Sequence, residues 1–173
     1  AFPVWSYNST KVFMWGWDVF GEIQFAQDLE YTFNAAYTYA QDLTKNEPLI
    51  LVPPFAFNQQ MAYTFSKKNI EILLSHRFTG TQNRFPDTNF SVNLIESGTI
   101  IQKQLDVSTP PTGYHNLDIY FSLPLTNQTS FKSTIRLIVL NLTNTTYNDY
   151  LNRLRYYAAE IGRSVQLQLV LKY

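Results

Sequence analysis

The chain has 173 residues and a mass of 20.1 kDa, which is enough for one domain with a substantial core and too little for two ordinary domains. Its 13 basic and 13 acidic residues cancel, so no net positive field favours nucleic acid or an anionic membrane surface. The absence of cysteine excludes disulfides, thiolate catalysis and cysteine-ligated metal sites.

The N-terminal segment, residues 1–10, is short and unusually hydrophobic. Pro3 disfavours a helix there and limits backbone hydrogen bonding. The segment begins with Ala1, which is typical of an exported chain whose signal peptide has been removed; a trimmed chain is the alternative. Its large apolar side chains are Phe2, Val4, Trp5 and Tyr7.

Most of the remaining chain alternates apolar and polar residues with a period of two. A strand is expected from Lys11 to Phe20, and Gly21 allows a turn into a second strand that begins near Ile23. The same alternation recurs at residues 55–65, 70–78, 90–94, 117–123 and 165–173. Because successive side chains of a strand point to opposite faces, each run predicts a strand with one buried face and one wet face.

The connections between these runs carry turn and loop residues. Residues 66–69 suit a hairpin loop, whereas residues 79–88 and 108–116 contain the proline and glycine of surface loops. Residues 34–44 fit either a strand or a helix, and the strand is favoured.

One segment departs from the period of two. Near residues 146–161, Tyr147, Tyr150, Leu154 and Ile161 recur at intervals of three and four, which predicts an amphipathic helix. The sequence therefore predicts an all-β fold, mainly an antiparallel β-sandwich of the jelly-roll or immunoglobulin-like type, with about nine or ten strands and one helix. Residues 11–173 form its single domain.

Residues with the chemistry of an active site are scarce. His76 is in phase with the apolar positions of its strand, and His115 lies in a proline and glycine loop. A metal site or a nucleophile and base pair would need them to meet each other or a carboxylate, such as Asp87, Asp106 or Asp118. Nothing in the spacing indicates such a meeting. We therefore expect no enzyme activity, no catalytic or metal-binding residue and no cofactor.

The motif that does recur is the glycosylation sequon N-x-[ST]. Five sequons occur where random placement would give roughly two. Most fall at strand ends or in loops, where a sugar would face water. We therefore expect N-linked glycans at Asn8, Asn89, Asn127, Asn141 and Asn144.

The N-terminal segment has two possible uses. It can fold back on its own subunit as an edge strand, or it can complete the sheet of a neighbouring subunit. The second arrangement is head to tail and gives a filament when it is repeated. Burial of its four large apolar side chains contributes on the order of 8 kcal/mol before ordering costs.

This cysteine-free, aromatic chain, with several sequons and a short hydrophobic first strand, resembles the subunit of an archaeal extracellular filament of the thread type. A TasA-like bundling pilin is the nearest alternative. The resemblance implies that residues 1–10 act as a donor strand and that the protein forms a homopolymer on the cell surface. It also implies N-glycosylation and roles in adhesion and biofilm.

Other classes of function stay open. A viral capsid or shell protein of the jelly-roll type would form closed assemblies, and a secreted carbohydrate-binding module would bind glycans as a monomer. The aromatic content of 16% invites the latter, but Trp15 and Trp17 share one face with Phe13, as core residues do. No stretch approaches the roughly 18 to 20 apolar residues of a spanning helix, so no membrane span is expected.

Overall fold

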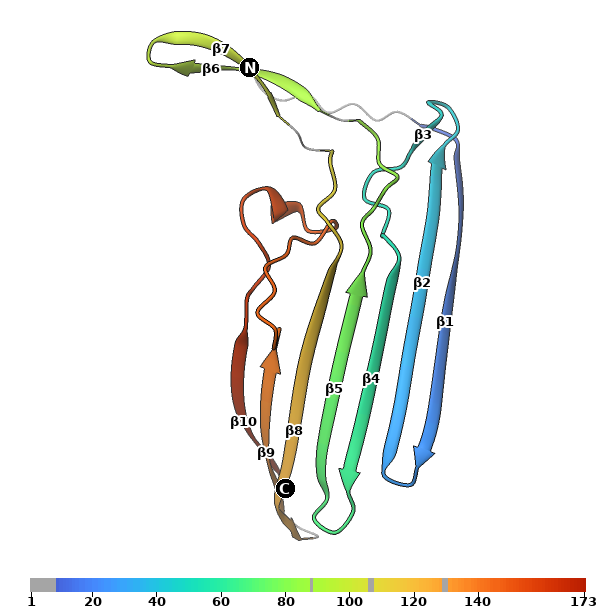
Figure 1. The fold of residues 1–173 in the computed structure, drawn as a ribbon, viewed down its shortest axis with the longest axis vertical. Coiled ribbons are helices and arrows are strands. Elements are labelled where there is room, and N and C mark those ends of the chain that lie inside the picture. Colours follow the sequence, from blue (N-terminus) through green and yellow to red (C-terminus); the bar gives the residue numbers. More distant parts are fainter. Residues whose placement is uncertain (1–8, 88, 106–107, 129–130) are drawn as a thin grey trace.

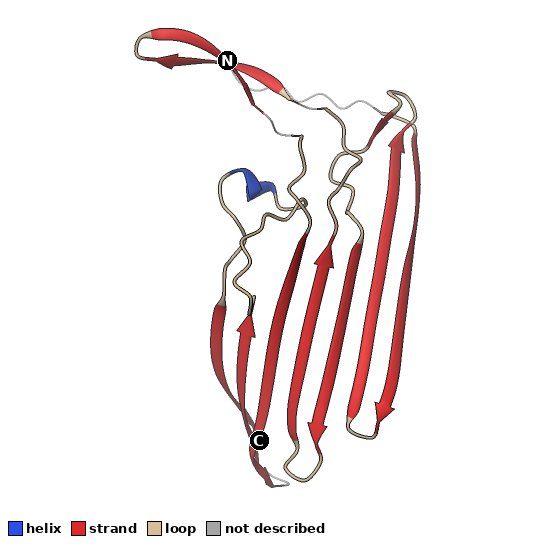
Figure 2. Cartoon of the chain, viewed as in Figure 1, coloured by secondary structure: helices blue, strands red, loops and turns tan. Residues whose placement is uncertain are grey.

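The computed structural model describes residues 9–87, 89–105, 108–128 and 131–173, and it confirms an all-β, mainly antiparallel fold with about ten strands (Figures 1 and 2). The strands are β1 (Val12–Ala26), β2 (Leu29–Asp42), β3 (Glu47–Pro48), β4 (Ala56–Phe65), β5 (Ile70–Thr79), β6 (Phe90–Glu96), β7 (Thr99–Leu105), β8 (Tyr114–Gln128), β9 (Phe131–Leu140) and β10 (Ser164–Lys172). The short 3₁₀ helix η1 (Arg153–Tyr156) lies between β9 and β10.

The strands form two sheets of very different size. The large sheet has eight strands in the order β1-β2-β4-β5-β8-β9-β10, with β3 paired to β2, and all its pairings are antiparallel. Its order is that of a meander, because each strand pairs with the next long strand along the chain. The second sheet is the hairpin β6–β7, which is inserted between β5 and β8. Among the described strands, no strand of the hairpin packs on the large sheet.

The two ends of the large sheet differ in the length of their connections (Figure 1). At one end, which we call the turn end, β1 and β2 are joined by residues 27–28, and β4 and β5 by residues 66–69. At the other, which we call the loop end, the connections are residues 43–55, 80–113 and 141–163. The predicted hairpin loop at residues 66–69 is confirmed.

Strand β1 is longer than the sequence indicated, and the predicted turn at Gly21 is wrong. The strand runs through Gly21, which pairs with Phe33 of β2, and the turn comes at residues 27–28. A Cβ atom at position 21 would lie 2.4 Å from the Phe33 ring. This glycine therefore gives space to a cross-strand aromatic ring instead of bending the chain.

Residues 34–42 belong to β2, as the favoured interpretation of that ambiguous segment predicts. The predicted amphipathic helix at residues 146–161 is wrong. Only η1 is helical, and short polar side chains hold the surrounding backbone: Asp149 Oδ1 accepts from the Leu151 N–H, and Asn152 Oδ1 accepts from the Leu154 N–H. Such local hydrogen bonds compete with an α-helix.

Buried apolar side chains are few among the described residues and lie near the loop end. They are Ala40, Val52, Tyr114 and Tyr150. Gln82 Nε2 joins two of the loops there by donating to the Val52 carbonyl at 2.8 Å. The Arg84 guanidinium lies 3.9 Å from the ring centroid of Tyr39 in β2 and so fastens a loop to the sheet. The long strands themselves enclose no apolar core in the described chain.

Candidate functional site

The main candidate site is one whole face of the large sheet, which we call the apolar face. Antiparallel register brings the apolar positions of every strand to this side: Trp15 lies opposite Tyr39, Met61 opposite Leu74, and Leu137 opposite Leu167. Its members include Phe13, Trp15, Trp17, Val19, Ile23, Phe25, Tyr31, Phe33, Tyr37, Tyr39, Phe57, Met61, Tyr63, Phe65, Ile70, Ile72, Leu74, Phe78, Leu117, Ile119, Phe121, Leu123, Ile135, Leu137, Val139, Val165, Leu167, Leu169 and Leu171.

Much of this face is exposed. Phe25 of β1 is 61% exposed, Leu74 of the central strand β5 is 39% exposed, and Leu167 of β10 is 74% exposed. Apolar surface of this extent is far larger than the patches that monomeric soluble proteins carry. The face must therefore contact something apolar that is not part of the described chain.

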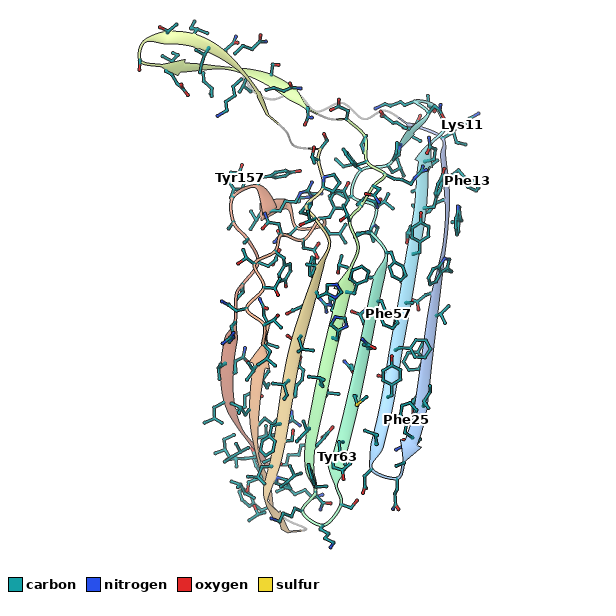
Figure 3. All side chains as sticks on the ribbon, in the orientation of Figure 1. Lys11, Phe13, Phe25, Phe57, Tyr63 and Tyr157 are labelled. Carbon is teal, nitrogen blue, oxygen red and sulfur yellow. The ribbon has the colours of Figure 1, made fainter. Side chains whose placement is uncertain are left out.

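Most aromatic side chains of the apolar face lie on β1, β2 and β4, where Phe13 and Phe25 are near opposite ends of β1 and Phe57 lies at a level between them (Figure 3). A chain of ring contacts crosses the loop end from β1 to β8, with centroid separations of 4.7 to 6.4 Å. It runs through Phe13, Tyr39, Trp15, Tyr37, Trp17, Phe55, Phe78 and His115. We call it the loop-end aromatic belt.

A second aromatic group lies toward the turn end. Phe25 contacts Tyr31 there, and Tyr63 contacts Phe65 with ring centroids 4.6 Å apart. Val19 and Ile23 separate Trp17 from Phe25 along β1, whereas on β2 and β4 ring contacts continue from Tyr31 through Phe33 to Phe57. Along β1 the apolar face thus changes from aromatic to aliphatic and back to aromatic, while β10 carries only aliphatic side chains on it.

The opposite face of the same strands is mostly polar. It carries Asp18 opposite Ala36, Asn58 opposite Arg77, and Ser122 opposite both Glu71 and Arg136. Cross-strand hydrogen bonds link some of these groups: Asn34 Nδ2 donates to Asp18 Oδ1 at 2.6 Å, and Arg77 Nε donates to Asn58 Oδ1 at 3.3 Å. This face is built to contact water or polar solutes.

The two histidines meet beside the loop-end aromatic belt, to which His115 belongs. The sequence spacing did not indicate this meeting. His76 Nε2 and His115 Nδ1 are 3.0 Å apart, and the imidazole planes differ by 18°. On its other side, His76 Nδ1 lies 3.0 Å from Gln59 Nε2, while Gln59 Oε1 accepts from the Tyr31 hydroxyl at 2.8 Å. A polar chain of four side chains therefore crosses β2, β4, β5 and β8 on an otherwise apolar face.

A second polar cluster lies under the loops at the loop end. The Tyr114 hydroxyl donates to Asp149 Oδ2 at 2.7 Å, and the Tyr114 ring stacks on Tyr147 with centroids 4.0 Å apart. Burial, with the nearby Glu160 carboxylate as a smaller cause, raises the pKa of Tyr147 above its usual value. These contacts fix the loop of residues 141–163 against β8.

The structure places the predicted sequons in different environments. Asn144 is exposed, whereas Asn141 is only 2% exposed and its side-chain amide exchanges two hydrogen bonds with the Thr145 backbone. Asn89 Oδ1 accepts from the Ser108 hydroxyl at 3.0 Å. Asn127 is in β8. Asn8 lies outside the described residues.

The predicted donor-strand residues Phe2, Val4, Trp5 and Tyr7 also lie outside the described residues, so their role stays a prediction. Within the described chain, no group of three or more histidine, aspartate or glutamate side chains is arranged to hold a metal ion. The described residues also contain no helix that is both long enough and apolar enough to cross a membrane.

Comparison with known proteins gives a likeness in fold. No family model matches the chain, and no curated protein matches it in sequence. Among solved structures, the chain is similar to the copper transporter OprC, with a TM-score of 0.73 and 15% sequence identity over 92% of this chain. The chain spans only 23% of the length of that transporter. At this identity the likeness concerns the arrangement of strands alone.

Proposed function

We propose that the large sheet is part of the membrane-spanning wall of a transport protein, with its apolar face against lipid and its polar face toward an aqueous passage. The observation that carries the proposal is the extended apolar face, which crosses seven strands in register and stays largely exposed. A surface of this kind is stable where its surroundings are hydrocarbon.

The strand lengths support this proposal. About 9 to 11 tilted residues are needed for a strand to cross a bilayer. The shortest of the seven long strands, β4, β5, β9 and β10, have 9 or 10 residues. The earlier expectation of no membrane span concerned apolar helices, which need about twice as many residues. A strand that crosses a membrane needs apolar residues only at alternate positions, because only one of its faces contacts lipid. It therefore does not need the long apolar run of a helix.

The aromatic zones support it as well. Tyrosine and tryptophan gather at the two interfaces of a membrane, because their rings have an apolar body and a polar tip. The apolar face has such groups toward both ends, with Trp15 and Trp17 at the loop end and Tyr31 and Tyr63 at the turn end. Short turns at one end and long loops at the other also match the asymmetry of membrane-spanning antiparallel sheets.

Backbone hydrogen bonding requires such a sheet to close on itself within lipid. The outer edges of β1 and β10 have no partner among the described strands, so further strands must cover them. The transport part of the proposal rests on the likeness to a structure named as a copper transporter. For this chain, we propose only that the sheet forms part of the wall of a passage.

The filament subunit stays the alternative proposal. It is favoured by the same open edges, since a strand from another copy could pair with β1 or β10. In that case the apolar face would be covered by neighbouring subunits. Cell-surface location, glycosylation and adhesion belong to this alternative and stay predictions with it.

Spin labelling distinguishes the two proposals, and the absence of native cysteine makes single-cysteine labelling clean. Nitroxide labels at Ile72 and Leu74 would probe the apolar face of β5, and labels at Glu71 and Ser75 would probe its polar face. For the full chain in lipid vesicles, we expect labels at 72 and 74 to collide mainly with oxygen and labels at 71 and 75 mainly with a water-soluble nickel complex. Low collision of the apolar-face labels with both reagents would favour burial between subunits and overturn the membrane proposal.

A further inference from the structure

We propose that His76 and His115 form a binding site for a divalent transition metal ion of the Cu²⁺, Ni²⁺ or Zn²⁺ class. The two imidazoles come from neighbouring strands, β5 and β8, and present His76 Nε2 and His115 Nδ1 to each other at 3.0 Å. Imidazole nitrogen is a preferred ligand for these ions. The inference does not depend on the proposed function.

The separation of the nitrogens fits one shared ion. Two nitrogens bound at about 2.0–2.1 Å to one ion lie about 3 Å apart when the angle at the ion is near 90°. The imidazole nitrogens now point at each other along one shared hydrogen bond, so each ring must rotate until the lone pairs of both nitrogens converge on a point beside the N···N line. His115 is exposed and has the space to rotate.

Gln59 and Tyr31 supply the outer hydrogen bonds that such a ligand needs. A metal-binding imidazole nearly always donates its second ring N–H to a nearby acceptor. With Gln59 Nε2 toward His76 Nδ1, the proton of neutral His76 is on Nε2 and is donated to His115. If the Gln59 amide turns over, its oxygen accepts a hydrogen bond from the N–H at His76 Nδ1, and Nε2, now without its proton, is free for the ion.

The Tyr31 hydroxyl suits both orientations of that amide. It donates to Gln59 Oε1 in the structure, at 2.8 Å, and a hydroxyl can equally accept from the amide NH₂. The proton of His76 moves from Nε2 to Nδ1 in this rearrangement, and no net proton is lost from the neutral pair. Water or buffer fills the other positions on the ion, because no third histidine, aspartate or glutamate joins the pair in the described chain.

The composition of the chain makes the proposal easy to test. These are the only two histidines of the sequence, and it has no cysteine. Titration of the full chain with Cu²⁺ and with Zn²⁺, in neutral detergent and in a buffer without chelators, should give one binding event per chain. We expect His76→Gln and His115→Asn each to weaken binding at least tenfold, and the double substitution to abolish it.

Ser75→Ala is the matched control, because Ser75 neighbours His76 but faces the opposite side of β5. It should leave the affinity unchanged. Gln59→Leu removes the hydrogen bonds of Gln59 with His76 and Tyr31 but no metal ligand, and it should weaken binding by about tenfold or more. Acidification should weaken binding in the unaltered chain, because a protonated imidazole cannot bind an ion.

Electron paramagnetic resonance of bound Cu²⁺ tests the site without any substitution. Chain labelled with ¹⁵N only at histidine should show coupling of the ion to two imidazole nitrogens. Absence of Cu²⁺ and Zn²⁺ binding, coupling to fewer than two imidazoles, or equal binding by the double variant would overturn the proposal and leave a hydrogen-bonded histidine pair.

Discussion

The long strands and the loop end of this protein are stabilised in different ways. At the loop end, Tyr114 and Tyr150 are buried, Gln82 and Arg84 fasten the loops, and polar side chains cap the backbone. Along the strands, backbone pairing is continuous, but the large apolar side chains stay exposed on one face. Buried side chains and side-chain hydrogen bonds hold the loop end together, whereas the strands expose an apolar face that a bilayer would cover.

The largest expected effect comes from a charge in the middle of the apolar face. Leu74→Arg should destabilise the protein in lipid vesicles by about 2–4 kcal/mol, because a charged side chain there would lose its hydration in hydrocarbon. The free energy of unfolding, measured with a chemical denaturant, gives the value.

Ser75→Arg on the opposite face is its control and should cost far less. Equal costs for the two arginine variants would remove the distinction between the faces and contradict the account.

At the loop end, the expected effect is smaller and should not depend on lipid. Tyr114→Phe removes the hydroxyl that donates to Asp149 Oδ2 at 2.7 Å. A hydrogen bond to a charged group contributes about 1.5–3 kcal/mol. Unfolding measured in detergent and in vesicles should show the same loss; a loss confined to vesicles would mean that this residue also contacts lipid.

Gly21 tests the packing of the strands themselves. In Gly21→Ala, the new Cβ would lie 2.4 Å from the Phe33 ring, so the ring must move. We expect the free energy of unfolding to fall by about 1–2 kcal/mol, as it does at other overpacked sites. The double variant Gly21→Ala with Phe33→Leu should lose less free energy of unfolding than the two single variants lose together. Strictly additive losses would show that the two residues do not interact.

The smallest effect is a dependence on pH at the loop end. Burial raises the pKa of Tyr147 above its ordinary value of 10.0. The stabilisation from this shift is therefore fully present below pH 10 and is lost as the pH rises through the higher pKa of the folded state. Tyr147→Phe should weaken the dependence of the free energy of unfolding on pH above pH 10. An unchanged pH dependence would mean that another group causes it.

The sequence predicted the strands well because a period of two is a local property. It identified the hairpin loop at residues 66–69 and much of the alternation in β1, β2, β4, β5, β8 and β10. It misread Gly21, which a cross-strand ring and not a turn explains. It failed at residues 146–161, because helical spacing of Tyr147, Tyr150 and Leu154 says nothing about the Asx hydrogen bonds of Asp149 and Asn152.

The sequence could not tell what the apolar positions face. Alternation has the same period whether Leu74 and Leu137 face a protein core, another subunit or lipid. Only the register across seven strands shows that these positions form one exposed face. The meeting of His76 with His115 was equally invisible, because it depends on the pairing of β5 with β8 across 39 residues of sequence.

The central claim is tested most directly by the fluorescence of Trp15 and Trp17, which are 47% and 43% exposed on the apolar face. The full chain, with Trp5 replaced by Phe, would be folded into vesicles made with lipids brominated on their acyl chains. Bromine quenches only tryptophans that contact it, so the account predicts strong quenching relative to unbrominated vesicles. Unchanged fluorescence in a correctly folded, vesicle-bound chain would show that the apolar face does not contact lipid and would contradict the account.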